Sequence, residues 1–364
     1  MNAVHFRVIG GGLMGRLMAL GLLRKGHRVS LYDQGDATGR TAAAYVAAAM
    51  LAPYAESVDA EPEIVALGIQ SLALWHSLLE SLPQEVFFDA KGTLVLWHPS
   101  DRDQALQFRQ RLDRLGTGLS PDVAPKVLDR EGITLLEPHL RDRFSQGLYL
   151  PKEGQLDNRA LLESLAKALE LEGADLHYGF TVDTLDFGDD WVIDCRGMGG
   201  KPAWPSLRGV RGEVLRVESR DVVLQRPVRL LHPRYPLYIA PKPKGIFVVG
   251  ATQIETEDYS PASVRSALEL LSALYSVHPG FGEARILEIV SQCRPALRDN
   301  APEIRRNGSR SIAINGLYRH GYLMAPALME AGLSLIEQLL HGSEDIESWC
   351  KASRWPHLYH LNPL

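Results

Sequence analysis

Short apolar runs and amphipathic stretches alternate in the first part of the chain. The run Phe6–Ile9 predicts a buried strand, Leu13–Lys25 a helix and His27–Tyr32 a second strand. A longer amphipathic helix is expected over Pro62–Leu82, with an apolar stripe formed by Leu67, Leu72, Leu74, Leu78 and Leu79. A strand, a helix and a strand in this order are typical of an α/β nucleotide-binding domain.

The pattern becomes richer in strands further along the chain. Strands are predicted over Gly92–Trp97, Trp191–Cys195, Val210–Glu218, Leu237–Ala240, Ile246–Gly250 and Ser311–Ile314. Helices are predicted over Asp101–Leu115, Leu156–Glu172, Ser263–Tyr275 and, as the last element, Ala325–Leu340. The strands between Val210 and Gly250 resemble an antiparallel set, whereas the chain shows no internal repeat and no low-complexity tract.

Two interleaved domains follow from this alternation. The predicted fold class is α/β, with a Rossmann-like nucleotide-binding domain interleaved with an α+β substrate domain built on an antiparallel sheet. Residues 1–75, 145–207 and 294–364 are assigned to the nucleotide-binding domain. Residues 76–144 and 208–293 are assigned to the substrate-binding domain. A chain of 364 residues is long enough for two such domains.

A glycine-rich loop lies between the first strand and the first helix. Gly10-x-Gly12-x-x-Gly15 makes a tight turn, allows close approach of a pyrophosphate and lets the helix pack on the strand. The helix start stabilises the anion. Asp33, at the end of the second strand, is placed to accept hydrogen bonds from both ribose hydroxyls. An acid there disfavours NADP, so the loop predicts NAD or FAD.

Composition and charge narrow the class further. The chain is 45% hydrophobic and 23% charged, with a formal net charge of −5, so we expect neither nucleic acid nor anionic lipid as a partner. Cys195, Cys293 and Cys350 are few and widely spaced, which favours a reducing compartment over a disulfide framework. The only close histidine pair, His357 and His360, lies near the end of the chain, so no metal site is predicted.

The apolar stretches are too short or too interrupted for a membrane segment. The N-terminal stretch contains Arg16 and several glycines, unlike a signal peptide. The run around Ala42–Pro53 is shorter than the ~20 residues that a span needs. We therefore expect a cytoplasmic protein without a membrane span, and the sequence leaves open whether it forms a homo-oligomer.

Five segments in order resemble the D-amino-acid oxidase family, and within it the glycine oxidases of thiamine biosynthesis. They are Ala47–Pro53 with Glu56; Arg211–Glu213; Tyr238–Pro241 with Val248–Thr252; Cys293–Pro295 with Asp299 and Pro302; and Leu317–Pro326. The resemblance covers essentially the whole chain. It implies noncovalently bound FAD, a small amine or amino acid as substrate, and O2 or another electron acceptor.

The resemblance also assigns roles to individual residues. It places Arg294, Arg319 and Tyr238 at the carboxylate of the substrate, and a guanidinium binds a carboxylate in two-pronged fashion. Gln253 and Met50 would line the substrate pocket. The cofactor-binding set that it implies comprises Gly10, Gly12, Leu13, Met14, Gly15, Asp33, Gln34, Arg40, Thr41, Ala49, Met50, Leu51, Val182, Gly197, His320, Gly321, Tyr322 and Leu323.

The implied chemistry needs no side-chain general base. The α-hydrogen passes as a hydride to the flavin, and the imine product hydrolyses in water, while the protein supplies placement and electrostatics. Backbone amides of Gly321, Tyr322 and Leu323, just before the last helix, would stabilise the anionic reduced flavin.

Some positions depart from the family pattern, and they leave alternatives open. Ala44 and Tyr45 stand where Ser or Thr is usual, Gln253 replaces an apolar residue, and Arg319-His320 replaces Arg-Asn. The sequence therefore also allows a dehydrogenase that uses another acceptor, a family member with a large substrate such as tRNA, or a flavin-binding accessory protein without amine turnover. The acidic balance and the lack of basic tracts argue against a tRNA substrate.

Overall fold

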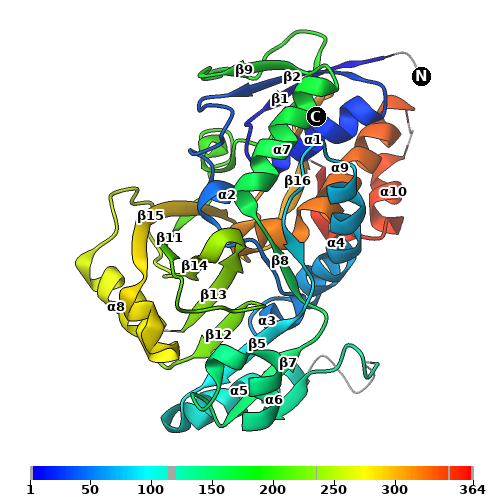
Figure 1. Cartoon of the computed structure of the whole chain (residues 1–364). Coiled ribbons are helices and arrows are strands. Elements are labelled where there is room, and N and C mark those ends of the chain that lie inside the picture. The colour runs from blue at the N-terminus through cyan, green and yellow to red at the C-terminus, as the bar shows by residue number, and fades with distance from the viewer. Residues whose placement is uncertain (1–2, 114–119, 235, 343–344, 362–364) are drawn as a thin grey trace.

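Two large sheets and a small one between them organise the protein. A computed structural model of the chain describes residues 3–113, 120–234, 236–342 and 345–361. Figure 1 shows one large sheet in the upper half, covered by long helices, and the other in the lower half, flanked by shorter ones. The chain passes between the halves several times, as the interleaved pattern predicted.

The upper sheet is mostly parallel and has the order β18-β16-β17-β10-β1-β2-β9 in the described part of the chain. Strands β1, β2, β9, β10 and β17 run parallel, whereas β16 is antiparallel to β17. The bounds are β1 His5–Ile9, β2 Arg28–Asp33, β9 Asp175–Tyr178, β10 Trp191–Asp194, β16 Glu303–Arg306, β17 Ser311–Asn315 and β18 Tyr359–Leu361.

The lower sheet is mostly antiparallel and has the order β15-β11-β14-β13-β12-β5-β7-β6, again among the described residues. One pair, β12 with β5, is parallel. The bounds are β5 Thr93–Trp97, β6 Lys126–Asp129, β7 Gln146–Leu150, β11 Arg208–Glu218, β12 Val228–Leu231, β13 Leu237–Lys242, β14 Ile246–Gly250 and β15 Arg285–Ala296. The small sheet contains β3 Met50–Leu51, β4 Phe88–Asp89 and β8 Gly154–Leu156.

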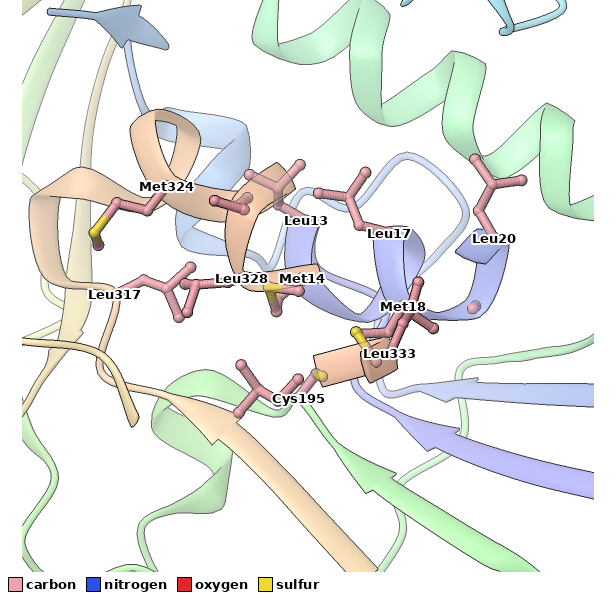
Figure 2. Close-up of a cluster of buried hydrophobic side chains, with 14 of the residues drawn as sticks. Leu13, Met14, Leu17, Met18, Leu20, Cys195, Leu317, Met324, Leu328 and Leu333 are labelled. Carbon is pink, nitrogen blue, oxygen red and sulfur yellow. The ribbon is translucent and has the colours of Figure 1, made fainter. Parts of the chain in front are cut away.

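Helices surround the upper sheet and flank the lower one. Their bounds are α1 Leu13–Arg24, α2 Ala43–Val46, α3 Pro53–Glu56, α4 Pro62–Glu80, α5 Arg102–Leu112, α6 Arg130–Leu136, α7 Asn158–Leu171, α8 Val264–Val277, α9 Gly321–Leu340 and α10 Ile346–Ala352. Helix α1 is almost entirely buried and contacts α7 and α9. Figure 2 shows Leu17 and Met18 of α1 in the apolar cluster that it shares with Leu328 and Leu333 of α9.

Helix α9 begins earlier than its proline predicts. Pro326 lies in its sixth position and has no N–H to donate to the carbonyl oxygen of Tyr322. The buried indole Nε1 of Trp75 donates to that oxygen instead, at 2.8 Å, and Ser71 Oγ accepts from Ala327 N at 3.1 Å. Helix α4 thus supplies the donor that the proline lacks, and a further hydrogen bond at Ala327. Residues 318–340 are apolar enough to cross a membrane by composition, but 61% of that stretch is buried, as expected of a core helix.

The predicted elements up to the last helix are present, with shifted ends, and the fold class is confirmed. The prediction of α9 was wrong at its start, which is Gly321 rather than Ala325, and in its place as last element, because α10 follows. Three predicted domain limits disagree with the observed elements. The limit 75/76 lies inside α4, and the limit 293/294 lies inside β15. The limit 144/145 assigns β7, at 146–150, to the nucleotide-binding domain, although this strand belongs to the lower sheet. The end predicted for α5 at Leu115 lies outside the described residues.

Alanine substitutions at two glycines of the loop before α1 are predicted to lower the free energy of unfolding by different amounts. A Cβ at Gly15 would overlap the carbonyl oxygen of Gly10, so Gly15→Ala must push α1 from β1 and should lower the free energy of unfolding by about 3 kcal/mol. A Cβ at Gly12 would come no closer than 3.6 Å to another atom, so Gly12→Ala should cost less than about 1 kcal/mol. Denaturant unfolding of the two apoproteins tests this, and equal losses would contradict it.

Candidate active site

A cavity of about 1360 Å³ lies where the two halves of the molecule meet. Its walls come from the loop before α1, the segment 41–50, strands β11–β15 and the start of α9. Parallel strands open their carboxyl ends at one edge of the sheet, which is the usual place for a nucleotide. The cavity therefore joins a nucleotide-binding edge to the face of an antiparallel sheet.

The nucleotide end has the geometry that the glycine pattern predicts. Gly10 has a φ of 101°, in the left-handed region, and Gly12 presents no side chain at the start of α1. Asp33 accepts from Gly11 N at 2.6 Å and from Gly35 N at 2.7 Å, one bond at each carboxylate oxygen. Each oxygen keeps a lone pair for a ribose hydroxyl.

Two buried basic side chains hold this end together, mostly through main-chain oxygens. The Arg16 guanidinium donates to the carbonyls of Gly11, Leu162 and Ala37. Lys242 Nζ, on β13, donates to Ala48 O at 2.8 Å, Leu156 O at 2.7 Å and Gln155 Oε1 at 3.1 Å. Burial lowers the pKa of Lys242 to about 7. These ties connect the lower sheet to the segment that the family resemblance places beneath the flavin.

Most of the predicted cofactor residues line the cavity. They are Gly10, Gly12, Leu13, Met14, Asp33, Gln34, Thr41, Ala49, Met50, Gly197, His320, Gly321, Tyr322 and Leu323. Four others lie elsewhere. Gly15 lies behind the loop, Leu51 is fully buried in the apolar core, Arg40 is exposed, and Val182 packs against the cluster of Ile9, Tyr32 and Val192.

The amides of Gly321, Tyr322 and Leu323 form the first turn of α9 rather than a loop before it. Tyr318–His320 adds a 3₁₀ turn ahead of the helix. Amides in a first turn lack intrahelical acceptors and carry the positive end of the helix dipole, so they are better placed to stabilise a negative charge than the predicted loop. This corrects the sequence prediction and keeps its electrostatic argument.

A largely buried carboxylate, Glu56, gathers two guanidinium groups and an imidazole from two segments at this end of the cavity. Glu56 Oε1 accepts from Arg229 of β12, and Oε2 lies 2.9 Å from Arg319 Nε. His320 Nδ1 lies 3.4 Å from the same Oε2. Burial opposes the charged carboxylate, but Arg229, Arg319 and His320 outweigh it and hold the pKa of Glu56 well below its usual range.

His320 is neutral at neutral pH as a consequence of its surroundings. Burial lowers its pKa to about 4; the nearby Glu56 opposes this shift, while Arg319 and Arg229 add to it. A neutral imidazole whose Nδ1 faces a carboxylate carries its proton on Nδ1 and leaves Nε2 as an acceptor. The histidine that replaces the family asparagine therefore adds no charge here.

A second buried carboxylate, Glu153, lies behind Glu56. Its Oε1 accepts from Ala55 N of α3 at 2.6 Å, which fixes the short helix that carries Glu56. Burial raises the pKa of Glu153 to about 7, against the opposing effect of Arg229. Sequence reasoning missed Glu153 and Arg229, because each lies far along the chain from its partners and belongs to no motif.

The two predicted substrate arginines differ in their partners. Arg319 is paired with Glu56 and, at 3.5 Å, with Asp59, and its Nη1 donates to Gln253 Oε1 at 3.3 Å. Arg294 Nη1 and Nη2 both donate to Thr252 O at 3.3 Å. Among the described residues, no carboxylate lies within ion-pair distance of Arg294. Arg294 thus keeps an uncompensated charge in the cavity wall.

The remaining predicted substrate residues lie nearby. Tyr238 pairs with Gly250 across β13 and β14, where a Cβ would lie 2.6 Å from the Tyr238 hydroxyl. Burial raises the pKa of Tyr238, so its hydroxyl remains a donor at neutral pH. Met50 and Gln253 also line the cavity, although Gln253 is largely exposed. The structure therefore brings together all five residues predicted to contact the substrate.

The departures at Ala44 and Tyr45 have a local explanation. Ala44 O accepts from Tyr322 Oη at 3.0 Å and from Asn158 Nδ2 at 3.1 Å. The Tyr45 ring lies 4.0 Å from the Arg159 guanidinium. The segment is therefore held by main-chain oxygens and a cation–π contact, which need no hydroxyl side chain at position 44.

Comparison with known proteins decides the family. A statistical model of the family described as FAD dependent oxidoreductase (DAO) matches residues 6–331. The chain belongs to the DAO family of FAD-dependent oxidoreductases. FAD is the cofactor of this family, and the glycine loop, Asp33 and the size of the cavity fit it.

Proteins described as ThiO and as glycine oxidase are among the relatives of this chain within the DAO family. A protein of Rhizobium etli described as a thiamine biosynthesis oxidoreductase, ThiO, is 41% identical over 88% of this chain and 93% of its own length. The glycine oxidase of Bacillus subtilis is 26% identical over 95% of each chain. Among solved structures, iminodiacetate oxidase from Chelativorans shares the fold with a TM-score of 0.80, at 22% identity over 99% of this chain and 100% of that one.

Replacing Glu56 should destabilise the protein more than replacing its exposed neighbour. Glu56→Gln leaves the partly buried Arg229 and Arg319 without their shared carboxylate, so we expect a loss of about 2 kcal/mol in the free energy of unfolding. Asp59→Asn is the matched control: Asp59 also pairs with Arg319 but is half exposed, and its loss should cost under about 1 kcal/mol. Equal losses of unfolding free energy in the two variants, measured with denaturant, would contradict the central role of Glu56.

Glu153 should make stability depend on pH. Its pKa is raised in the folded state, so folding binds a proton and stability falls as the pH rises from about 4.5 to about 7. Glu153→Gln keeps the acceptor for Ala55 N and removes the titration. Its free energy of unfolding relative to that of the parent should therefore rise by on the order of 2–3 kcal/mol between pH 5 and pH 8. Unfolding measured across that range tests this, and a constant difference would contradict it.

Proposed function

We propose that the protein oxidises the C–N bond of a small amino acid, with glycine or a glycine-like amine as the first candidate. The observation that carries this is the Arg294 guanidinium, which faces the cavity with main-chain oxygens as its acceptors. A guanidinium whose partners are carbonyl oxygens can bind a substrate carboxylate without displacing another carboxylate. The printed names of the relatives, ThiO and glycine oxidase, support a substrate of this size.

The chain's own residues would place the substrate. Arg294 binds the carboxylate, the Tyr238 hydroxyl donates to it, and Met50 lines the wall beside it. Arg319 is occupied by Glu56, so we propose that it shapes the pocket and contributes less to carboxylate binding. Orientation of this kind contributes to the rate because the reacting C–H bond is held in one direction.

When bound, FAD would supply the acceptor for the hydride of the α-carbon and would pass the two electrons on to O2 or another acceptor. By the family resemblance, the first turn of α9 would face the pyrimidine end of the flavin, where its amides would stabilise negative charge. The imine product hydrolyses in water. Oxygen uptake with substrate supports an oxidase, whereas reduction of a dye without oxygen uptake supports a dehydrogenase.

We further propose that FAD is held noncovalently. Cys293 Sγ lies 3.6 Å from Asp258 O and 3.7 Å from Thr256 O, directed at the 252–261 loop. The neighbouring side chain, Gln292, has no thiol that could form a thioether with the flavin.

We also propose the division into two domains and the cytoplasmic location that the sequence predicts.

Removing the Arg294 side chain should weaken substrate binding specifically. For Arg294→Ala, the KM of the best amino acid should rise by about one to two orders of magnitude, because a charge-assisted pair of hydrogen bonds is lost. Arg294→Lys keeps the charge without the fork and should recover only part of that loss. Steady-state kinetics with FAD content measured in parallel tests this.

An amine without a carboxylate provides the control for this prediction. Its KM should change by less than about threefold in the same variants, since it makes no contact of this kind. An unchanged KM for the amino acid in an Arg294→Ala protein that retains FAD would show that the carboxylate is bound elsewhere.

A further inference from the structure

A buried ion pair on the far face of β11 holds the loop that orients the active-site arginines. Residues of a strand point alternately to its two faces. Gly212 faces the cavity, where a Cβ would overlap the Arg294 guanidinium, and Arg211 and Glu213 point away from it. Arg211 is 3% and Glu213 1% exposed, and their side chains lie 2.7 Å apart.

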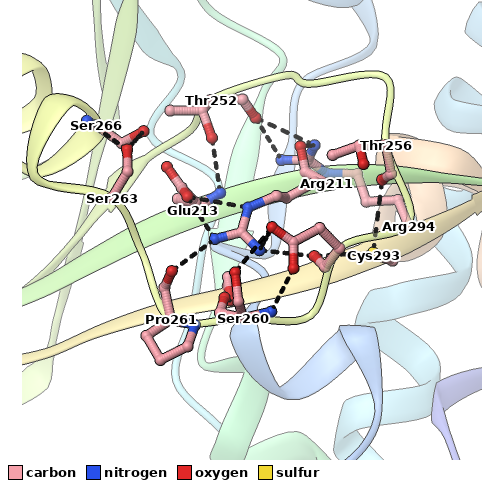
Figure 3. A network of polar contacts seen from close by, with 12 residues as sticks. Arg211, Glu213, Thr252, Thr256, Ser260, Pro261, Ser263, Ser266, Cys293 and Arg294 are labelled. Carbon is pink, nitrogen blue, oxygen red and sulfur yellow. Dashed lines mark hydrogen bonds and ion pairs between the residues drawn. The ribbon is translucent and has the colours of Figure 1, made fainter.

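The Arg211 guanidinium joins this pair to the loop of residues 251–263, between β14 and α8. It donates to Asp258 O at 2.6 Å and to Pro261 O at 2.9 Å, as well as to Glu213 Oε1. Figure 3 shows these bonds converging on the guanidinium from the loop that curves around it. The Arg211 backbone also exchanges hydrogen bonds with Ile254 at 2.9 and 3.0 Å.

Glu213 holds the start of the same loop. Its backbone N–H donates to Thr252 Oγ1 at 2.9 Å. The carbonyl oxygen of Thr252 accepts from both terminal nitrogens of Arg294, and the next residue, Gln253, accepts from Arg319. One loop therefore carries the acceptors of both arginines; the Arg211 side chain fixes it near its end, and the Glu213 main chain fixes its start.

We propose that Arg211 and Glu213 are positioning residues for substrate-carboxylate binding, acting through the Thr252 carbonyl that orients the Arg294 fork. This rests on the proposed function of Arg294. A guanidinium donates two parallel hydrogen bonds to a carboxylate only in one orientation. Small displacements of the carbonyl that orients the guanidinium therefore weaken binding. Neither residue touches the cavity, and their effect reaches the substrate only through the loop.

The chain offers a matched control pair for this proposal. Arg226, just before β12, pairs with Glu137, just after α6, with side chains 7% and 0% exposed, and it also donates to two main-chain carbonyls, those of Lys91 and Leu136. Arg226 does not line the cavity. Arg211→Lys and Arg226→Lys therefore remove the same kind of buried fork, one behind the loop and one away from it.

The experiment measures acetate binding to the FAD-loaded protein through the change in oxidised-flavin absorbance, which needs no turnover. In Arg211→Lys the Kd for acetate should rise about tenfold, as expected for one misplaced charge-assisted contact, and in Arg226→Lys by less than about twofold. The KM of the best amino acid should rise with the Kd, while that of an amine without a carboxylate stays close to its parent value. Equal Kd values in the two lysine variants would overturn the proposal.

A milder pair covers the case in which Arg211→Lys does not fold. Thr252→Val removes the acceptor of Glu213 N–H while keeping the shape, and Thr252→Ser restores it. Thr252→Val should weaken acetate binding and Thr252→Ser should recover it; no difference between them would overturn the proposal. Acetate binding that depends on Arg294 and Arg211 without flavin reduction by any amine would refute the proposed function and leave this inference standing. No acetate binding by the parent protein would refute the carboxylate site and the positioning role together.

Discussion

The arrangement of the active site depends on one buried carboxylate. Glu56 comes from the short helix α3, and its partners come from β12 of the lower sheet and from the turn before α9 of the upper half. It therefore joins the two halves at the cavity and compensates the charges of Arg229 and Arg319. Arg294, on β15, has main-chain oxygens as its partners. This division of partners is the basis for proposing that Arg294 binds an anionic group from outside the chain.

Main-chain oxygens recur as the partners of the buried cations around this site. Arg16 holds the glycine loop, Lys242 holds the main chain at Ala48, and Arg211 holds the loop between β14 and α8. A carbonyl oxygen fixes the position of a cation without neutralising it. These bonds fix the segments around the cavity, while Glu213 and Asp258 balance the charge of Arg211.

Local sequence was sufficient for the parts of the fold that local interactions determine. The glycine loop, Asp33 and the strands of strong apolar pattern could be predicted because their residues lie close together in the chain. Strand β15 could not, because its residues are mostly half-buried and show no alternation. The start of α9 could not either, since Trp75, some 250 residues earlier, supplies the hydrogen bond that Pro326 lacks. For the same reason the family motifs indicated Arg294 and Tyr238, whereas Glu153 and Arg229 emerged only from tertiary contacts.

Anaerobic mixing of the FAD-loaded protein with glycine and with methylamine tests the central claim most directly. The two amines differ by the carboxylate that Arg294 is proposed to bind, and loss of the oxidised-flavin absorbance reports reduction without regard to the electron acceptor. The account predicts that glycine, or a similarly small amino acid such as sarcosine or D-alanine, reduces the flavin, and that methylamine at the same concentration does so at least about tenfold more slowly. Equally fast reduction by methylamine, or no reduction by any of these amino acids, would contradict it.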